Sequence, residues 1–361
     1  MYLITNRALK KGKGLHSIGK TPHPKGPNEL RLLRVEEVGG EWSTIEVQDT
    51  LSLDKVKQLK ATHKLDIDVK DQWHSSLEVA CLLFDQARRE KKSILFFVHG
   101  YNNDIGDVLK TAKEIECLYE VIVVPFSWPA NGGGVISGAA SYLSDKSDAM
   151  ASAGALNRTI GKIQYFHTLL TKAERKKFEL AAQKKHPKNK DAANALYTKL
   201  IEKNCSVKIS LLCHSMGNYV LEHTFNCDKN ATSKLVFDNV CLIAADTNNE
   251  GHDRWINRLD VRKRLYVVIN ENDFALMASR IKPGDEQKAR LGHYTKKLVS
   301  PNAYYVDLTT VDGVNQGHNY FKGETASSNK QLKSLFKEMF SGMASDDKLV
   351  YRSDNNSYQL L

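Results

Sequence analysis

Ser215 occupies a position typical of a catalytic nucleophile. It follows a mostly apolar run at residues 209–213, short enough for a strand buried on both faces, and it precedes residues 219–225, whose apolar spacing predicts a helix. A serine at such a strand-to-helix turn exposes its hydroxyl. The N–H of Met216, at the start of the helix, would then face a negative oxygen formed on a substrate. The pattern therefore predicts nucleophilic attack on an acyl carbonyl.

The short motif around Ser215 differs in one position from the nucleophile elbow G-x-S-x-G, because Cys213 replaces the first glycine. Cysteine is small, so the sharp turn remains possible. A competing interpretation is that Ser215 only caps the following helix, which is a frequent role of serine. The rest of the chain has to supply the context that separates these interpretations.

A serine nucleophile needs a general base and an acid that orients it. In α/β hydrolases the acid and then the histidine follow the serine along the chain. Asp273 comes just after the penultimate apolar run, and His318 lies beyond the last one. We therefore expect Asp273 to be the acid and His318 the base. Asp246 ends the preceding apolar run and is the alternative acid.

A second loop has the composition expected for an oxyanion hole. An apolar run at residues 93–98 leads into His99-Gly-Tyr-Asn-Asn103, where glycine lets backbone N–H groups approach a reacting carbonyl. The N–H of Tyr101 or Asn102 would act together with that of Met216. For His99 we prefer a structural role, in which it orients this loop by hydrogen bonding. The residues expected to line the pocket are Asp246, His99, Trp128 and His214.

Short apolar runs alternate with amphipathic, helix-like segments along most of the chain. The predicted buried strands are residues 93–99, 121–126, 209–213, 240–246, 264–270 and 303–308. This alternation predicts an α/β fold with a mostly parallel, doubly wound sheet and helices on both faces. It is the arrangement that an α/β-hydrolase site requires.

One segment interrupts the alternation. Residues 135–204 are rich in alanine and lysine, with helical spacing and a break at His186-Pro187. We predict a helical, basic insertion before the nucleophile strand, either a cap over the site or a crossover helix with added surface structure. Residues 1–134 and 205–343 then form the two parts of the hydrolase core. The mostly polar residues 344–361 are expected to be a flexible, frayed tail.

Composition limits the choice of function class. The 361 residues, 41% of them hydrophobic, suffice for one large α/β domain with an insertion or for two domains. The six cysteines form no C-x-x-C pair, and no secretory signal or membrane-length apolar run is present, so we expect a cytoplasmic protein. No metal-ligand cluster stands out, and residues 131–134 lack the flanking pattern of a phosphate-binding loop. We predict no cofactor and no metal.

The net charge of +10 raises the question of a polyanionic partner. Residues 171–203 hold ten Lys or Arg against four Asp or Glu, so this one segment carries more than half of the excess. A basic helical segment is most often a solvated face. Binding of nucleic acid or another polyanion is therefore possible but not favoured.

Several short motifs occur together in this chain. They are Phe97-Val-His-Gly-Tyr-Asn-Asn103, Phe126-Ser-Trp-Pro129, His214-Ser-Met-Gly-Asn218 and Gly317-His-Asn-Tyr-Phe321, with Thr5-Asn-Arg7 near the start. In combination they resemble DUF900, a bacterial family of α/β hydrolases of unknown function. The resemblance spans most of the chain except residues 135–204 and the tail. It implies the α/β-hydrolase fold and a role for Ser215, Asp273 and His318, but no particular substrate.

The leading hypothesis is a serine hydrolase that cleaves an ester or thioester, less readily an amide, through an acyl-enzyme. Its substrate would be a small acyl compound, as for an esterase, lipase or thioesterase. Two alternatives stay open: a catalytically silent protein that binds an acidic partner through its basic insertion, and an acyltransferase with the same triad. The sequence leaves the oligomeric state undefined.

Overall fold

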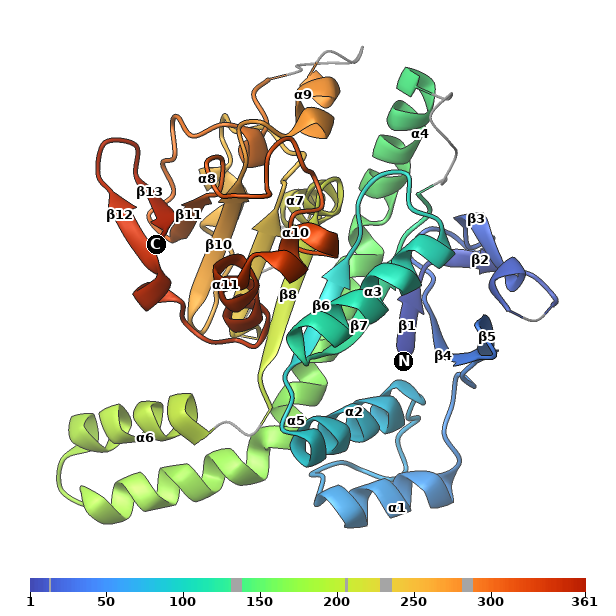
Figure 1. Cartoon of the computed structure of the whole chain (residues 1–361). Helices are drawn as coiled ribbons and strands as arrows, with labels where there is room; N and C mark the ends of the chain where they lie inside the picture. Colours follow the sequence, from blue (N-terminus) through green and yellow to red (C-terminus); the bar gives the residue numbers. More distant parts are fainter. Residues whose placement is uncertain (13, 131–137, 205–206, 228–235, 281–287) are drawn as a thin grey trace. The chain divides into compact units, whose positions relative to one another are not determined.

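The computed structural model describes residues 1–12, 14–130, 138–204, 207–227, 236–280 and 288–361 (Figure 1). The chain divides into two compact units. Unit 1 comprises Met1–Val47, Ser93–Ile160 and Ile209–Leu361, and unit 2 comprises Gln48–Lys92 and Gly161–Lys208. Every residue predicted to form the site belongs to unit 1.

Unit 1 is built on a large sheet. Its strands are β1 (Tyr2–Thr5), β4 (Arg31–Val38), β5 (Glu41–Glu46), β6 (Ile94–Val98), β7 (Ile122–Ser127), β8 (Ile209–His214), β9 (Asn239–Ile243), β10 (Arg264–Ile269), β11 (Ala303–Asp307), β12 (Leu349–Arg352) and β13 (Ser357–Leu360). In the described part of the chain they form one 11-stranded sheet in the order β12-β13-β11-β10-β9-β8-β6-β7-β1-β4-β5. Neighbouring strands are parallel from β13 to β1, while β12, β4 and β5 add antiparallel pairs at the two ends. The predicted mostly parallel α/β sheet is confirmed.

Helices precede or follow most of the parallel strands. Those of unit 1 are α3 (Ile105–Tyr119), α4 (Gly138–Ala151), α7 (Gly217–Cys227), α8 (Asp253–Ile256), α9 (Phe274–Arg280), α10 (Gly323–Ser328) and α11 (Lys330–Phe340). Short 3₁₀ turns lie at Leu15–Ser17, Leu291–His293 and Asp346–Lys348. Helix α5 (Ala153–Lys185) begins in unit 1 and continues in unit 2.

The order of the strands indicates where in unit 1 a ligand site is expected. Helix α3 connects β6 to β7 and α7 connects β8 to β9, in opposite directions along the sheet. Because crossovers between parallel strands are right-handed, these helices lie on opposite faces, and Figure 1 shows α3 and α11 in front of the sheet. The direction reverses between β6 and β8, and α/β proteins bind ligands beyond the carboxyl ends of the strands at such a switch point.

A large hydrophobic cluster lies on the face of the sheet that carries α3 and α11. Helix α3 starts with a reciprocal capping box between Asp104 and Asp107, which satisfies N–H groups that its first turn leaves unpaired. Its apolar stripe ends in the buried Tyr119, whose ring packs edge-on against Phe336 and Phe340 of α11 at 6.4 and 5.0 Å. These aromatic contacts hold α11 against α3.

A two-stranded sheet accompanies the start of the chain. It consists of β2 (Arg7–Leu9) and β3 (Ile18–Pro22), which pair antiparallel. Strand β2 follows β1 after the single residue Asn6. Arg7 therefore lies near the carboxyl end of β1, beside β7 in the main sheet.

Residues 344–361, expected to form a flexible, frayed tail, contain two strands in this structure. Strands β12 and β13 form an antiparallel hairpin, and β13 adds in parallel to β11 through the pair Val306 and Tyr358. The ring of Tyr358 stacks on Tyr304 at 5.0 Å, and Leu349 is buried in the large hydrophobic cluster. The segment reads as polar because only the first residue of each of these short strands is buried.

The segment between β7 and β8 is helical, formed by α4, α5 and α6 (Lys190–Asn204). The predicted break at His186-Pro187 falls between α5 and α6. Residues 131–134 lie outside the described residues. The division at residues 134 and 204, and a role of 135–204 as a cap, stay predictions.

Unit 2 is made of helices. It contains α1 (Leu53–His63), α2 (Ser76–Glu90), most of α5, and α6. Within it, the ring of Phe84 on α2 lies 6.0 Å from that of the buried His167 on α5, and Arg88 pairs with Glu174 at 3.3 Å. None of the helices within the described ranges has the length and apolar character needed to cross a bilayer.

Candidate active site

Ser215 lies in a strained turn between β8 and α7. Its φ of 53° is in the left-handed region, which non-glycine residues adopt rarely and mostly where the surroundings enforce it. Hydrogen bonds to β9 and to the loop that follows it hold Ser215 in this conformation. The Ser215 N–H donates to Ile243 O at 3.0 Å, and the Asp246 N–H donates to Ser215 O at 3.2 Å. This strand–turn–helix geometry is that of a nucleophile elbow.

Two glycines allow the backbone to pass close to this turn. A Cβ on Gly217 would lie 2.6 Å from Val98 O, and a Cβ on Gly100 would lie 2.7 Å from the Ser215 Cβ. Both distances are shorter than atoms tolerate. The end of β6 and the Ser215 turn are therefore in direct backbone contact, as the pairing of β6 with β8 requires.

Cys213 does not need to be glycine in this structure. It is the fifth residue of β8, its side chain is fully buried, and burial raises the pKa of its thiol well above the usual value. The thiol is therefore an apolar packing group. The close approach that the motif requires falls on Gly217 and Gly100 instead.

Substituting Gly100 by alanine tests this contact. The added methyl group must separate the loop from Ser215, and a displacement of about 1 Å in a catalytic site can cost roughly 10²-fold in rate. We expect Gly100→Ala to slow covalent labelling of Ser215 by a serine-directed probe by about that factor. Gly161→Ala is the matched control, since its Cβ would meet nothing within 4 Å. An unchanged labelling rate in Gly100→Ala would contradict the argument.

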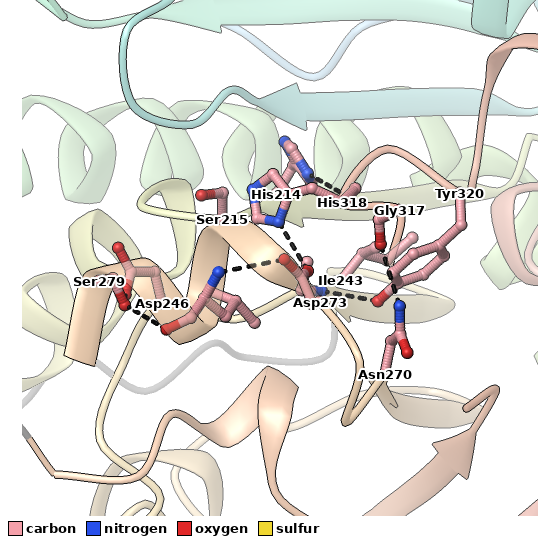
Figure 2. Close-up of polar contacts among 12 residues, drawn as sticks. His214, Ser215, Ile243, Asp246, Asn270, Asp273, Ser279, Gly317, His318 and Tyr320 are labelled. Carbon is pink, nitrogen blue, oxygen red and sulfur yellow. Dashed lines mark hydrogen bonds and ion pairs between the residues drawn. The ribbon is translucent and has the colours of Figure 1, made fainter. Parts of the chain in front are cut away.

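His318 and Asp273 form a short, partly buried pair. The Nδ1 of His318 lies 2.7 Å from Asp273 Oδ2, with the Asp273 side chain fully buried and that of His318 19% exposed (Figure 2). The other oxygen, Oδ1, accepts the N–H of Leu276 at 3.1 Å. With Nδ1 protonated, the neutral imidazole keeps Nε2 as an acceptor. This is the tautomer that a general base needs.

The side chain of Asn270 holds the loop that carries His318. Asn270, at the end of β10, donates from Nδ2 to Asn315 O and Gly317 O, both at 3.0 Å. Asn270 is fully buried. These bonds fix the backbone just before His318, so the ring position does not depend on Asp273 alone.

Ser215 lies beside this pair. Figure 2 shows it next to the rings of His214 and His318. Within the described residues, Ser215 Oγ and His318 make no hydrogen bond with each other. Catalytic hydrogen bonds are often long in unliganded enzymes and shorten when substrate is bound. The structure thus joins Asp273 to His318, and Figure 2 shows Ser215 beside the His318 ring.

His214 contacts His318 rather than the hydroxyl of Ser215. Its Nε2 donates to His318 O at 3.1 Å, and its ring centroid lies 4.7 Å from that of His318 and 4.9 Å from that of Phe321. Burial, and then the neighbouring His318, lower the pKa of His214 well below its usual value. His214 is therefore neutral and supports the backbone of His318.

Asp246 has a different set of partners from Asp273. Its carboxylate accepts Tyr142 Oη at 3.0 Å and Ser279 Oγ at 2.9 Å, and it pairs with Arg290 Nε at 3.1 Å. The Arg290 and Asp246 side chains are each only 4% exposed. A carboxylate committed to a buried ion pair is poorly placed to orient His318. The geometry favours Asp273 over Asp246 as the acid.

The N–H groups predicted to bind the oxyanion differ in whether they already make a hydrogen bond. Met216 N–H, at the start of α7, makes no hydrogen bond within the described ranges of the chain. The Asn102 N–H donates to Asp145 Oδ2 at 3.2 Å, and Asp145 is fully buried on α4. Of the two N–H groups expected as alternatives, Tyr101 or Asn102, that of Asn102 is thus already occupied in this structure, and its role as an oxyanion donor stays a prediction. The role of Tyr101 stays a prediction.

His99 joins two loops. It donates from Nδ1 to Gly100 O at 2.9 Å and accepts the Trp128 N–H on Nε2 at 3.2 Å, while Trp128 Nε1 donates to His99 O at 2.9 Å. The two rings stack at 5.2 Å. Burial, with a smaller effect of the Arg7 charge, lowers the pKa of His99 to about 3, so this imidazole is neutral. It connects the loop after β6 to the loop after β7.

Asn218 is a site residue that the sequence reasoning missed. It is fully buried, and its Nδ2 lies within hydrogen-bond distance of Cys213 O (3.1 Å), Ser215 O (3.0 Å) and Ile243 O (3.2 Å). One amide thus holds both sides of the strained turn. The signal in the sequence that could have indicated this role is a polar residue three positions after the serine, at the start of the predicted helix.

With this geometry established, the family can be stated. A model of the family DUF900, described as "Alpha/beta hydrolase of unknown function", matches residues 82–170 and 172–334. The chain belongs to the DUF900 family. The DUF900 match includes Ser215, Asp273 and His318 and supports hydrolase activity. No curated protein and no solved structure matches the chain.

No group of three or more His, Cys, Asp or Glu side chains that could hold a metal ion occurs among the described residues. The groups that the structure brings together around Ser215 are its hydroxyl, a histidine paired with a carboxylate, and backbone N–H groups. This set is typical of acyl transfer through a serine nucleophile.

Proposed function

We propose that this DUF900 protein is a serine hydrolase in which Ser215 is the nucleophile, His318 the general base and Asp273 the orienting acid. One observation carries the proposal: the 2.7 Å contact between His318 Nδ1 and a fully buried Asp273, next to a serine with φ of 53°. A serine that only caps a helix does not require an adjacent His–Asp pair. The combination therefore favours catalysis over capping.

In the proposed mechanism, His318 Nε2 takes the proton of Ser215 Oγ as the oxygen attacks the acyl carbon. Asp273 stabilises the imidazolium that results. His318 then gives its proton to the leaving group, which departs and leaves an acyl ester on Ser215. His318 then takes a proton from a water molecule, whose oxygen attacks the acyl carbon of the ester on Ser215. The bond to Ser215 Oγ breaks, the acid is released, and Ser215 receives the proton from His318.

The negative oxygen of the tetrahedral intermediate would bind to the N–H of Met216 and to that of Tyr101. Each such donor is worth about 3 kcal/mol in enzymes where it has been removed. The N-terminus of α7, which begins at Gly217, adds the positive end of its helix dipole. Gly100 lets the loop approach closely enough for the second donor.

The proposed substrate is a small ester or thioester. An amide is less readily cleaved, since its amine must be protonated before it can leave. An acyltransferase would use the same groups and differ only in the acceptor that resolves the acyl-enzyme. Comparing product acid with acyl transfer to an added alcohol or amine separates these two outcomes.

The test of the proposal is covalent labelling. Purified protein is treated with a fluorophosphonate probe, and the adduct is located by peptide mass mapping. We expect one adduct, on Ser215, and its loss in His318→Ala. If no adduct forms under conditions that fully label a known serine hydrolase, the proposal is wrong. Salt-sensitive binding of a polyanion would then support the silent, partner-binding alternative.

A further inference from the structure

Arg7 is a buried charged residue that the proposed mechanism does not use. It is 1% exposed and follows two fully buried polar residues, Thr5 and Asn6. The three residues connect β1 to β2. They lie outside residues 82–334, where the family model matches.

The guanidinium of Arg7 joins two loops of the site. Nη2 donates to Asn103 O at 3.0 Å and to Ala130 O at 3.1 Å, and Nε donates to Ser127 Oγ at 2.9 Å. Nη1 lies 3.5 Å from Gly19 O. Asn103 ends the loop after β6, whereas Ser127 and Ala130 border the loop after β7. One side chain therefore fixes both loops at once.

The two loops converge on the proposed oxyanion site. From Asn103 the chain leads directly back to Gly100, whose backbone touches Ser215. From Ser127 the next residue is Trp128, which bonds to His99 through two hydrogen bonds. Arg7 thus holds the His99–Asn103 loop from its far end and, through Trp128, from its near end.

Arg7 is itself rigidly placed. Thr5 Oγ1 accepts the Arg7 N–H at 3.1 Å and donates to Ser127 O at 2.7 Å. Asn6 Nδ2 donates to Ser152 Oγ at 2.9 Å, at the junction between α4 and α5. The Arg7 side chain therefore starts from a backbone that these hydrogen bonds hold in place.

Burying a cation costs free energy that an apolar residue would avoid. Burial lowers the pKa of Arg7 to about 10, and the charges of Asp104, Asp145 and Asp148 act in the opposite direction, so the group stays charged at neutral pH. Arginine offers what a smaller or neutral side chain lacks: a planar fork that reaches three acceptors on two loops. Packing alone does not explain that choice.

We propose that Arg7 is a positioning residue for hydrolysis, which sets the His99–Asn103 loop so that the Tyr101 N–H faces the oxyanion. This rests on the proposed function of Ser215. A lysine at position 7 keeps the charge but presents a single ammonium group, which cannot replace the fork. The loop is then held at one point and the second oxyanion donor moves.

The experiment compares Arg7→Lys with the native protein in two measurements. The first is hydrogen exchange of the peptide that contains residues 99–104, and the second is kcat and KM for an ester, with the rate of fluorophosphonate labelling. We expect faster exchange in that peptide, a kcat lowered roughly ten- to a hundred-fold and a nearly unchanged KM. Peptides from α11 should exchange as in the native protein.

The matched control is Arg31→Lys on β4, whose ion pairs are with Glu29 and Glu46. It should change neither measurement. If Arg7→Lys does not fold, Ser127→Ala removes only the acceptor of Nε and should shift both measurements in the same direction by a smaller factor.

The outcomes are distinguishable. Unchanged exchange at residues 99–104 overturns the positioning role, whether or not the protein is labelled. Faster exchange with unchanged kcat and labelling rate shows that the loop position does not matter for catalysis and also overturns it. A native protein that is not labelled at Ser215 refutes the proposed function itself, and with it the inference.

Discussion

Ser215→Ala is expected to abolish turnover and covalent labelling while the protein stays folded. Losing the nucleophile removes the acyl-enzyme route, and in serine hydrolases that loss lowers kcat by roughly 10⁶-fold. The fold should survive, because within the described residues the hydroxyl makes no hydrogen bond that its removal would leave unpaired. We expect a change in the free energy of unfolding below about 1 kcal/mol.

The measurement is hydrolysis of a chromogenic ester, together with intact mass after labelling and a thermal melt. Ser210→Ala is the matched control, since Ser210 lies in β8, the strand that leads to Ser215, is fully buried and has an unpartnered hydroxyl. It should keep full labelling and comparable stability. Turnover retained by Ser215→Ala would remove this residue from the mechanism.

The second large effect is expected for Asp273→Asn. An amide in place of the carboxylate can donate to His318 Nδ1, which would move the ring proton to Nε2 and remove the base. In a well-studied triad this change lowers kcat by about 10⁴-fold without altering the geometry. We expect the same order of loss here, with the fold retained.

Asp246→Asn should give the opposite pattern. The substitution removes one charge of the buried pair with Arg290, and breaking a buried ion pair costs about 3 kcal/mol or more in stability. The activity per folded molecule should fall much less than in Asp273→Asn. Measuring kcat and denaturant midpoints of both variants decides the question. A loss of kcat in Asp246→Asn with a normal rate in Asp273→Asn would exchange the two assignments.

The sequence predicted what local pattern can encode. Buried strands showed as apolar runs, so the positions after them, Ser215, Asp273 and His318, could be read in chain order. The mostly parallel sheet followed from the same alternation and is confirmed by the strand pairing. Residues at the carboxyl ends of neighbouring parallel strands meet because the sheet places them there.

The remaining details depend on contacts between distant parts of the chain. Asp145 accepts the Asn102 N–H across 43 residues, and nothing in either local pattern indicates that pairing. Arg7 meets Asn103 and Ala130 across 96 and 123 residues. The final hairpin was missed for a related reason: its strands are too short for their alternation to stand out from polar neighbours.

The position of β1 also sets the order in which the molecule can fold. This strand precedes both of its neighbours in the sheet, β4 and β7, along the chain, and Thr5 bonds to Ser127, 122 residues later. During synthesis β1 can first pair with the nearby β4, so its other edge stays open until β7 leaves the ribosome. Open edges pair readily with other chains, and such long-range pairing is slow. We infer that aggregation of the nascent chain competes with folding during this interval, before the loops around Ser215 can close.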